Sequence, residues 1–181
     1  MKTGKVEEFP MIDPEYEARK ALMTKADLTW YDSIGGQTWG ANSAEPLPYG
    51  NMLRRLAADK NGNSVWVPLW AQSTVAEIDI NTHKITWHKL PIQMHPYKTV
   101  VDKNHNVYTD TSLADGVFRY MPSTQQWTLF RLPSHGCGSR HIGFDDYKGD
   151  LWLPCDQSDK VARFQFRSEA DLKGLEAAAI R

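Results

Sequence analysis

The sequence predicts an all-β fold in which four-stranded antiparallel units follow one another along the chain. One landmark is a segment ending in Leu-Pro, ITWHKLP at 85–91 and WTLFRLP at 127–133, which recurs after 42 residues. A second is a polar turn whose aspartates, Asp59, Asp102 and Asp146, are spaced 43 and 44 residues apart. Units of about 40 to 45 residues with four short strands are typical of the blades of a β-propeller.

Each unit contains strand-like runs of about four to seven residues, rich in Val, Ile, Trp, Tyr and Phe and bounded by Asn, Gly, Asp or Pro. In the first unit these runs are RRLAAD, VWVPL, TVAEIDI and ITWHKLP. Residues 48–167 hold three such repeats, and TGKVEEFP within 1–10 matches only the last strand of a preceding blade. Propellers usually close with about four to eight blades. Since the chain holds three repeats and one strand of another, we expect a partial propeller of about three to four units.

The two segments outside these repeats follow other patterns. Residues 11–47 begin with helix-forming residues and continue with Gly and Pro, which indicates a helical insertion or a degenerate blade with remnant strands. Residues 168–181 start at Ser168, a good N-cap, and continue with acidic residues and a run of Leu and Ala. This pattern predicts a short C-terminal helix.

Composition excludes several classes of protein. The 181 residues carry a formal net charge of -1, which argues against non-specific nucleic-acid binding. No apolar run approaches the ~20 residues that span a bilayer, and the N-terminus has no apolar signal-peptide core, so we expect no membrane partner; a longer parent protein could be periplasmic or secreted. Cys137 and Cys155 lie in one unit and should meet at one rim, where they form a disulfide in an oxidising compartment or stay as small buried hydrophobes.

The repeats DKNGNSVWVPL, AEIDINTHKITWHKLP, DKNHNVYTDT and TGKVEEFP resemble those of the streptogramin lyase (virginiamycin B lyase) family. The resemblance extends over 3–10 and nearly all of 48–167. It implies a seven-bladed propeller that opens a cyclic depsipeptide lactone by C–O elimination, an activity that confers antibiotic resistance. It also implies a histidine general base and a Mg²⁺ ion held by acidic residues that face the channel.

Carried onto this chain, the resemblance makes His141 in SRHIGFDD the candidate catalytic base. The acidic metal-site pattern is not preserved, because its positions fall on Leu69, Thr111 and Cys155. Asp110 and Asp156 each lie one residue away, on the opposite strand face unless a bulge intervenes, and are candidate ligand-binding residues. A metal-dependent lyase is therefore one hypothesis, and a non-catalytic platform for a ligand or a partner protein is the other.

Cationic residues mark the start of each inner strand, at Arg55, Lys98 and Arg140. Repetition about an axis should place these positions in a ring, where convergent positive charge attracts an anionic small molecule such as a carboxylate or phosphate. The alternative is that the cations pair with acidic residues of adjacent blades. Trp70 breaks the repeat pattern of the tryptophans and is a further candidate for the ligand surface.

The blade count also bears on partners. Each sheet of a propeller buries its faces against neighbouring sheets, so a chain with only about three units should leave apolar blade faces exposed. We expect such a chain to associate with itself, with the remainder of a longer propeller, or with a partner protein.

Overall fold

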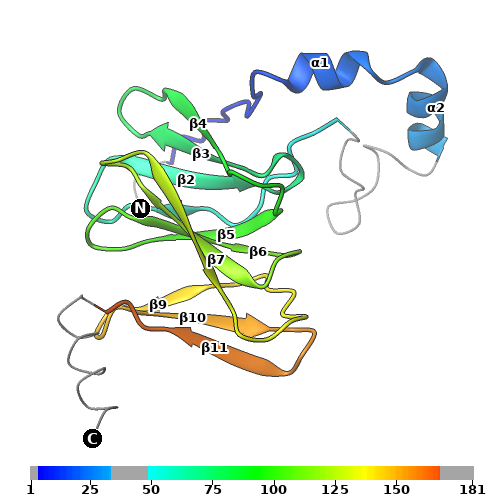
Figure 1. Ribbon diagram of the computed structural model, residues 1–181. Coiled ribbons are helices and arrows are strands. Elements are labelled where there is room, and N and C mark those ends of the chain that lie inside the picture. Colours follow the sequence, from blue (N-terminus) through cyan, green and yellow to red (C-terminus); the bar gives the residue numbers. More distant parts are fainter. Residues whose placement is uncertain (1–3, 34–48, 168–181) are drawn as a thin grey trace, which may run out of the picture.

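The computed structural model describes residues 4–33 and 49–167, and its strands form three antiparallel sheets. Figure 1 shows the sheets as successive layers of one stack, in the order of the sequence. We call them blade 1, with strand order β1-β2-β3-β4, blade 2, with order β5-β6-β7-β8, and blade 3, with order β11-β10-β9. The predicted all-β architecture of propeller blades is confirmed.

The strands are short, and each pairs with its sequence neighbour. Blade 1 consists of β1 (Ala57–Ala58), β2 (Ser64–Leu69), β3 (Thr74–Asp79) and β4 (Ile85–Lys89). Blade 2 consists of β5 (Pro96–Val101), β6 (Val107–Thr111), β7 (Gly116–Met121) and β8 (Gln126–Arg131). Blade 3 has three described strands, β9 (Gly143–Asp145), β10 (Asp150–Cys155) and β11 (Lys160–Phe164).

An aspartate closes the turn between the first two strands of every blade. The Asp59 carboxylate accepts a hydrogen bond from the Asn61 N–H at 3.0 Å, and Asp102 accepts one from the Asn104 N–H at 2.8 Å. In blade 3 this role belongs to Asp145, which accepts from the N–H two residues further on, at 3.0 Å. The repeat pattern predicted its neighbour Asp146 for this role. With Asp145 in its place, the three turn aspartates are 43 residues apart in both intervals.

One aromatic position of the repeat packs each blade onto the next. Trp66 of β2 is 2% exposed and lies against Tyr120 of blade 2, with ring centroids 5.9 Å apart. Tyr108 of β6, the equivalent residue, is also buried and lies 4.9 Å from the ring of Phe144 in blade 3. Recurrence of aromatic residues at the blade period therefore reflects packing between the blades.

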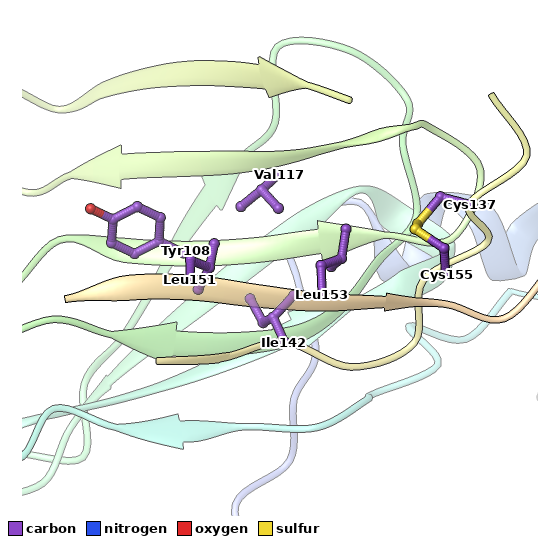
Figure 2. Packing of buried hydrophobic residues seen from close by; sticks show 7 residues of the cluster. All are labelled: Tyr108, Val117, Cys137, Ile142, Leu151, Leu153 and Cys155. Carbon is purple, nitrogen blue, oxygen red and sulfur yellow. A yellow bond between two sulfur atoms is a disulfide. The ribbon is translucent and has the colours of Figure 1, made fainter. Parts of the chain in front are cut away.

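The second interface is a mixed aliphatic and aromatic core. Figure 2 shows Tyr108 and Val117 of blade 2 beside Leu151, Leu153 and Ile142 of blade 3. The four aliphatic side chains are fully buried. The edge of this cluster is closed by a disulfide between Cys137, in the loop that enters blade 3, and Cys155, at the end of β10.

Two helices precede blade 1, α1 (Tyr16–Ala21) and α2 (Lys25–Ser33), in the region predicted as a helical insertion or a degenerate blade. Figure 1 shows both at the blade 1 end of the stack. Arg19 of α1 holds them there, because its guanidinium donates to Asp13 and to Asn51 Oδ1, the latter at 2.7 Å. Neither described helix has the length and apolar character of a bilayer span.

Two predicted terminal elements have different outcomes. No strand forms over the described residues 4–10, where the sequence predicted the last strand of a preceding blade. Phe9 instead packs against His83 in the β3–β4 turn, with ring centroids 4.8 Å apart. The predicted C-terminal helix over 168–181 lies outside the described residues.

The outer face of blade 3 repeats the pattern that is buried elsewhere. Trp152 occupies the position of Trp66 and Tyr108 but is 41% exposed. The same face carries Pro154 and its cross-strand partner Val161, which is 68% exposed. Because the equivalent aromatic positions of blades 1 and 2 are covered by a following blade, this face has the shape and chemistry of an interblade surface.

We therefore expect the isolated chain to self-associate, and Trp152→Ser to weaken that association by about tenfold or more, since burying an aromatic side chain contributes about 1.5–3 kcal/mol. Sedimentation velocity over a range of concentrations measures this. Tyr147→Ser is the matched control, because Tyr147 is 93% exposed in a turn away from this face. A parent chain that stays monomeric at all concentrations would contradict the prediction.

Candidate anion-binding site

The predicted cationic side chains of blades 1 and 2 meet around the imidazole of His141, which follows Arg140 in the segment before blade 3. Arg55 Nη1 lies 3.0 Å from His141 Nδ1, and Lys98 Nζ lies 2.8 Å from His141 Nε2. Arg55 Nη1 also donates to the backbone carbonyl of Arg140 at 3.2 Å. The fold therefore brings together Arg55, Lys98, Arg140 and His141, which we call the cation cluster.

Pairing between the inner strands of blades 1 and 2 positions the first two members. Arg55 forms a parallel bridge with Lys98, in which the Arg55 N–H donates to the Tyr97 carbonyl at 3.0 Å. The Thr99 N–H donates back to the Arg55 carbonyl at 3.1 Å. The backbone hydrogen bonds thus hold the two cationic side chains next to each other.

Asp110 supports the cluster from behind. It is fully buried at the end of β6, where one carboxylate oxygen accepts from the Lys98 N–H at 2.6 Å and the other from Ser139 Oγ at 3.0 Å. A register irregularity between Pro96 and Thr99 turns the Lys98 N–H toward Asp110. Asp110 therefore fixes two segments next to His141, at Lys98 and at Ser139. The sequence predicted Asp110 as a ligand-binding residue, whereas the structure places it behind the cluster.

Burial raises the pKa of Asp110 to about 6, although the hydrogen bonds from Lys98 and Ser139 favour the carboxylate. Burial also lowers the pKa of His141, and the nearby charges of Lys98 and Arg55 lower it further. The pKa of Lys98 is lowered by burial and by Arg55, against the attraction of Asp110. The site thus opposes the addition of a further positive charge, and the His141 ring is neutral at neutral pH.

The cation cluster contains more hydrogen-bond donors than acceptors. A neutral imidazole has one acceptor nitrogen, and an arginine or a charged lysine can only donate. Arg55 and Lys98 point at the two nitrogens of the same ring, so one of them faces an N–H instead of a lone pair. Within residues 4–33 and 49–167, neither Arg55 nor Lys98 forms an ion pair, while Arg140 lies 3.7 Å from the carboxylate of Asp156. The cluster therefore holds unmatched positive charge.

A cavity of about 270 Å³ adjoins the cluster. Arg140 lines it together with Trp70, the predicted candidate for the ligand surface, and with Arg54, the sequence neighbour of Arg55. Regular β1 begins only at Ala57, so both arginines can reach this side of the chain.

The residues at the family's metal positions do not fit a Mg²⁺ ion. Leu69 is fully buried and apolar, and Cys155 is bonded to Cys137. Thr111 directs its hydroxyl to the Ala114 carbonyl, at 2.7 Å. Among the described residues, moreover, no group of three or more His, Cys, Asp or Glu side chains is arranged to hold a metal ion.

The comparisons with known proteins bear on the fold. No protein-family model and no curated protein matches the chain. Virginiamycin B lyase from Staphylococcus aureus aligns with a TM-score of 0.55 and 16% identity, over 70% of this chain and 45% of its own. A streptogramin B lyase aligns with a TM-score of 0.56 and 15% identity, over 71% of this chain and 45% of its own. The WD40 β-propeller domain of Doa1 aligns with a TM-score of 0.53 and 11% identity, over 74% of this chain and 40% of its own.

This chain has a β-propeller fold. It spans less than half the length of each of these three matched structures. Because lyases and a WD40 domain match almost equally well, the likeness identifies the fold and leaves the chemistry to the residues of the site.

The raised pKa of Asp110 predicts a pH-dependent contribution to stability. An acid whose pKa rises from 3.8 in the unfolded chain to about 6 in the fold binds its proton more tightly when folded. Asp110 should therefore lower the free energy of unfolding as pH rises from about 4 to about 6, by roughly 3 kcal/mol in total. Urea unfolding of the parent and Asp110→Asn across this range measures the difference, with the variant gaining relative stability as pH rises.

Asp79→Asn is a control of opposite sign. Hydrogen bonds from Thr82 and Asn81 lower the pKa of Asp79, so its stabilising effect is present at neutral pH and lost as pH falls. If Asp110→Asn changed stability equally at all pH values, the buried carboxylate would not be the titrating group.

Proposed function

We propose that this propeller binds an anionic small molecule at the cation cluster, as a ligand-binding platform without a resident metal. The excess of donors around His141 carries the proposal, because an oxyanion supplies the acceptors that the imidazole cannot. A carboxylate or phosphate oxygen beside Arg55 and Lys98 would receive charge-assisted hydrogen bonds from both. It would also relieve the repulsion between their charges.

The arrangement of the site supports a preformed binding surface. The backbone bridge between Arg55 and Lys98 and the buried support from Asp110 hold the donors in place before a ligand arrives. A preorganised site loses less conformational entropy on binding than a flexible one. The Arg140 side chain is 64% exposed, and its Nε lies 3.7 Å from the carboxylate of Asp156. Such an exposed contact is weak, so the guanidinium can turn toward a ligand.

Anion binding is tested by calorimetric titration with acetate and phosphate at low salt. Lys98→Met keeps most of the aliphatic stem and removes the charge. We expect it to weaken binding about tenfold, since one charge-assisted hydrogen bond contributes about 1.5–3 kcal/mol and ~1.4 kcal/mol is a decade in affinity. The melting temperature should change little, because Lys98 lies outside the interblade cores.

Lys103→Met is the matched control, as an exposed lysine in the β5–β6 turn. Equal losses of affinity in the two variants would indicate a general effect of net charge. Absence of saturable binding to the parent chain would refute the proposal.

A metal-independent lyase is the second candidate, favoured by the neutral imidazole of His141 and by the structural likeness to streptogramin lyases. One matched structure, 18% identical, is a catalytically inactive histidine variant of virginiamycin B lyase with quinupristin. In this chain His141 would remove a proton as general base. Arg55 and Lys98 would stabilise the negative charge that develops on the neighbouring carbonyl oxygen.

Incubation with quinupristin decides between the two candidates. Ring opening by elimination leaves the mass unchanged, so the product is followed by liquid chromatography. A lyase would open the ring, and His141→Ala should abolish this reaction. For a non-catalytic platform we expect no product from the parent chain, even with added Mg²⁺.

A further inference from the structure

We propose that the cavity beside the cation cluster is a subsite for a flat aromatic ring, so that the preferred ligands of this chain are aromatic carboxylates. This inference rests on the proposed anion-binding function and names the class of ligand. Three observations carry it: an indole held in the cavity wall, an arginine near two aromatic rings whose buried Nε has no hydrogen-bond partner, and a lining that contains cations and no acidic residue.

The indole of Trp70 is held rigidly at this rim. Its Nε1–H donates to Ser112 Oγ of blade 2 at 3.2 Å, and its ring lies 4.1 Å from that of His95. His95 Nδ1 is also 3.0 Å from the Trp70 carbonyl. Unlike Trp66, which is buried between blades, Trp70 is half-buried and lines an open cavity. An aromatic ring fixed in this way can offer its surface to a ligand at little entropic cost.

Arg54 lies between two aromatic rings and has unused hydrogen-bonding capacity. Its guanidinium carbon is 5.2 Å from the centre of the Tyr97 ring and 5.9 Å from that of Trp70. Its Nε is buried and has no hydrogen-bond partner. Among the described residues, its side chain makes no ion pair. A buried donor without an acceptor is unfavourable, and a carboxylate in the cavity would bring acceptors to this guanidinium.

The cavity has the charge and size for such a ligand. Arg54 and Arg140 line it, and none of its lining residues is acidic. Gly138 also lines it, at a φ of +61°, a backbone conformation that favours glycine. The volume of about 270 Å³ is near the lower limit for small-molecule sites, about 300 Å³. It is suited to a single ring.

Arg140 connects the cavity to the cluster. Its side chain lines the cavity, while its carbonyl accepts a hydrogen bond from Arg55. A ligand whose carboxylate lies at Arg140 can therefore place its ring against Trp70 and remain beside the cation cluster. This places the charge and the ring of one small molecule on adjoining surfaces.

The test compares three carboxylates by calorimetry at low salt: acetate, cyclohexanecarboxylate and benzoate. We expect benzoate to bind at least tenfold more tightly than acetate, and cyclohexanecarboxylate to be intermediate, because it fills the cavity without stacking. Trp70→Leu should weaken benzoate about tenfold and leave acetate unchanged, and Trp70→Phe should retain most of the preference. Trp30→Leu is the matched control, because Trp30 is 64% exposed on α2.

The outcomes separate this inference from the proposed function. If benzoate and acetate bind equally and Lys98→Met weakens both, the cation cluster binds anions and the aromatic subsite is refuted. If Trp70→Leu weakens benzoate while Lys98→Met changes nothing, the subsite is confirmed and the role of the cluster is refuted. If no carboxylate binds to the folded parent chain, both are refuted. Thermal melts of each variant verify that it is folded.

Discussion

A small antiparallel sheet with two apolar faces can exclude water from both only by stacking against other sheets, and the rest of this structure depends on that constraint. Trp66 and Tyr108, at one position of the repeat, fill the spaces between consecutive blades. Each buried aromatic side chain removes about 150–250 Å² from water. Because stacking fixes the inner strands next to one another, residues far apart in sequence, such as Arg55 and Lys98, become neighbours.

The site is held in place by Asp110, whose charged form is disfavoured by burial. A buried carboxylate loses its hydration, and the raised pKa of Asp110 expresses that loss. Its two hydrogen bonds secure Lys98 in blade 2 and Ser139 in the loop before blade 3. An apolar residue at this position would leave the Lys98 N–H without this acceptor, whereas the Ser139 hydroxyl could still donate to the His141 carbonyl, 3.1 Å away. The buried charge of Asp110 thus reduces the stability of the fold while it holds the candidate site in position, a pattern common in binding and catalytic sites.

Electrostatics and aromatic packing act together on this face of the propeller. Burial lowers the pKa of His141, and the charges of Lys98 and Arg55 lower it further. Trp70 and Tyr97 offer π faces to the guanidinium of Arg54. The proposed aromatic carboxylate would match both features, its negative charge to the cations and its flat ring to the aromatic side chains.

The sequence by itself determined the blade period, the strand pattern, the recurrence of Trp66 and Trp152 at one position of the repeat, and the cations at the inner-strand starts, because these are local patterns repeated along the chain. Tertiary structure alone decided that Asp110 lies behind the site, that Arg54 lines one cavity with Arg140, and that residues 4–10 form no strand. The first two features depend on a β5 irregularity and on a shortened β1, and in the third Phe9 packs against His83 instead. No periodicity encodes them, because they arise from contacts between blades, whose geometry is set by packing in three dimensions.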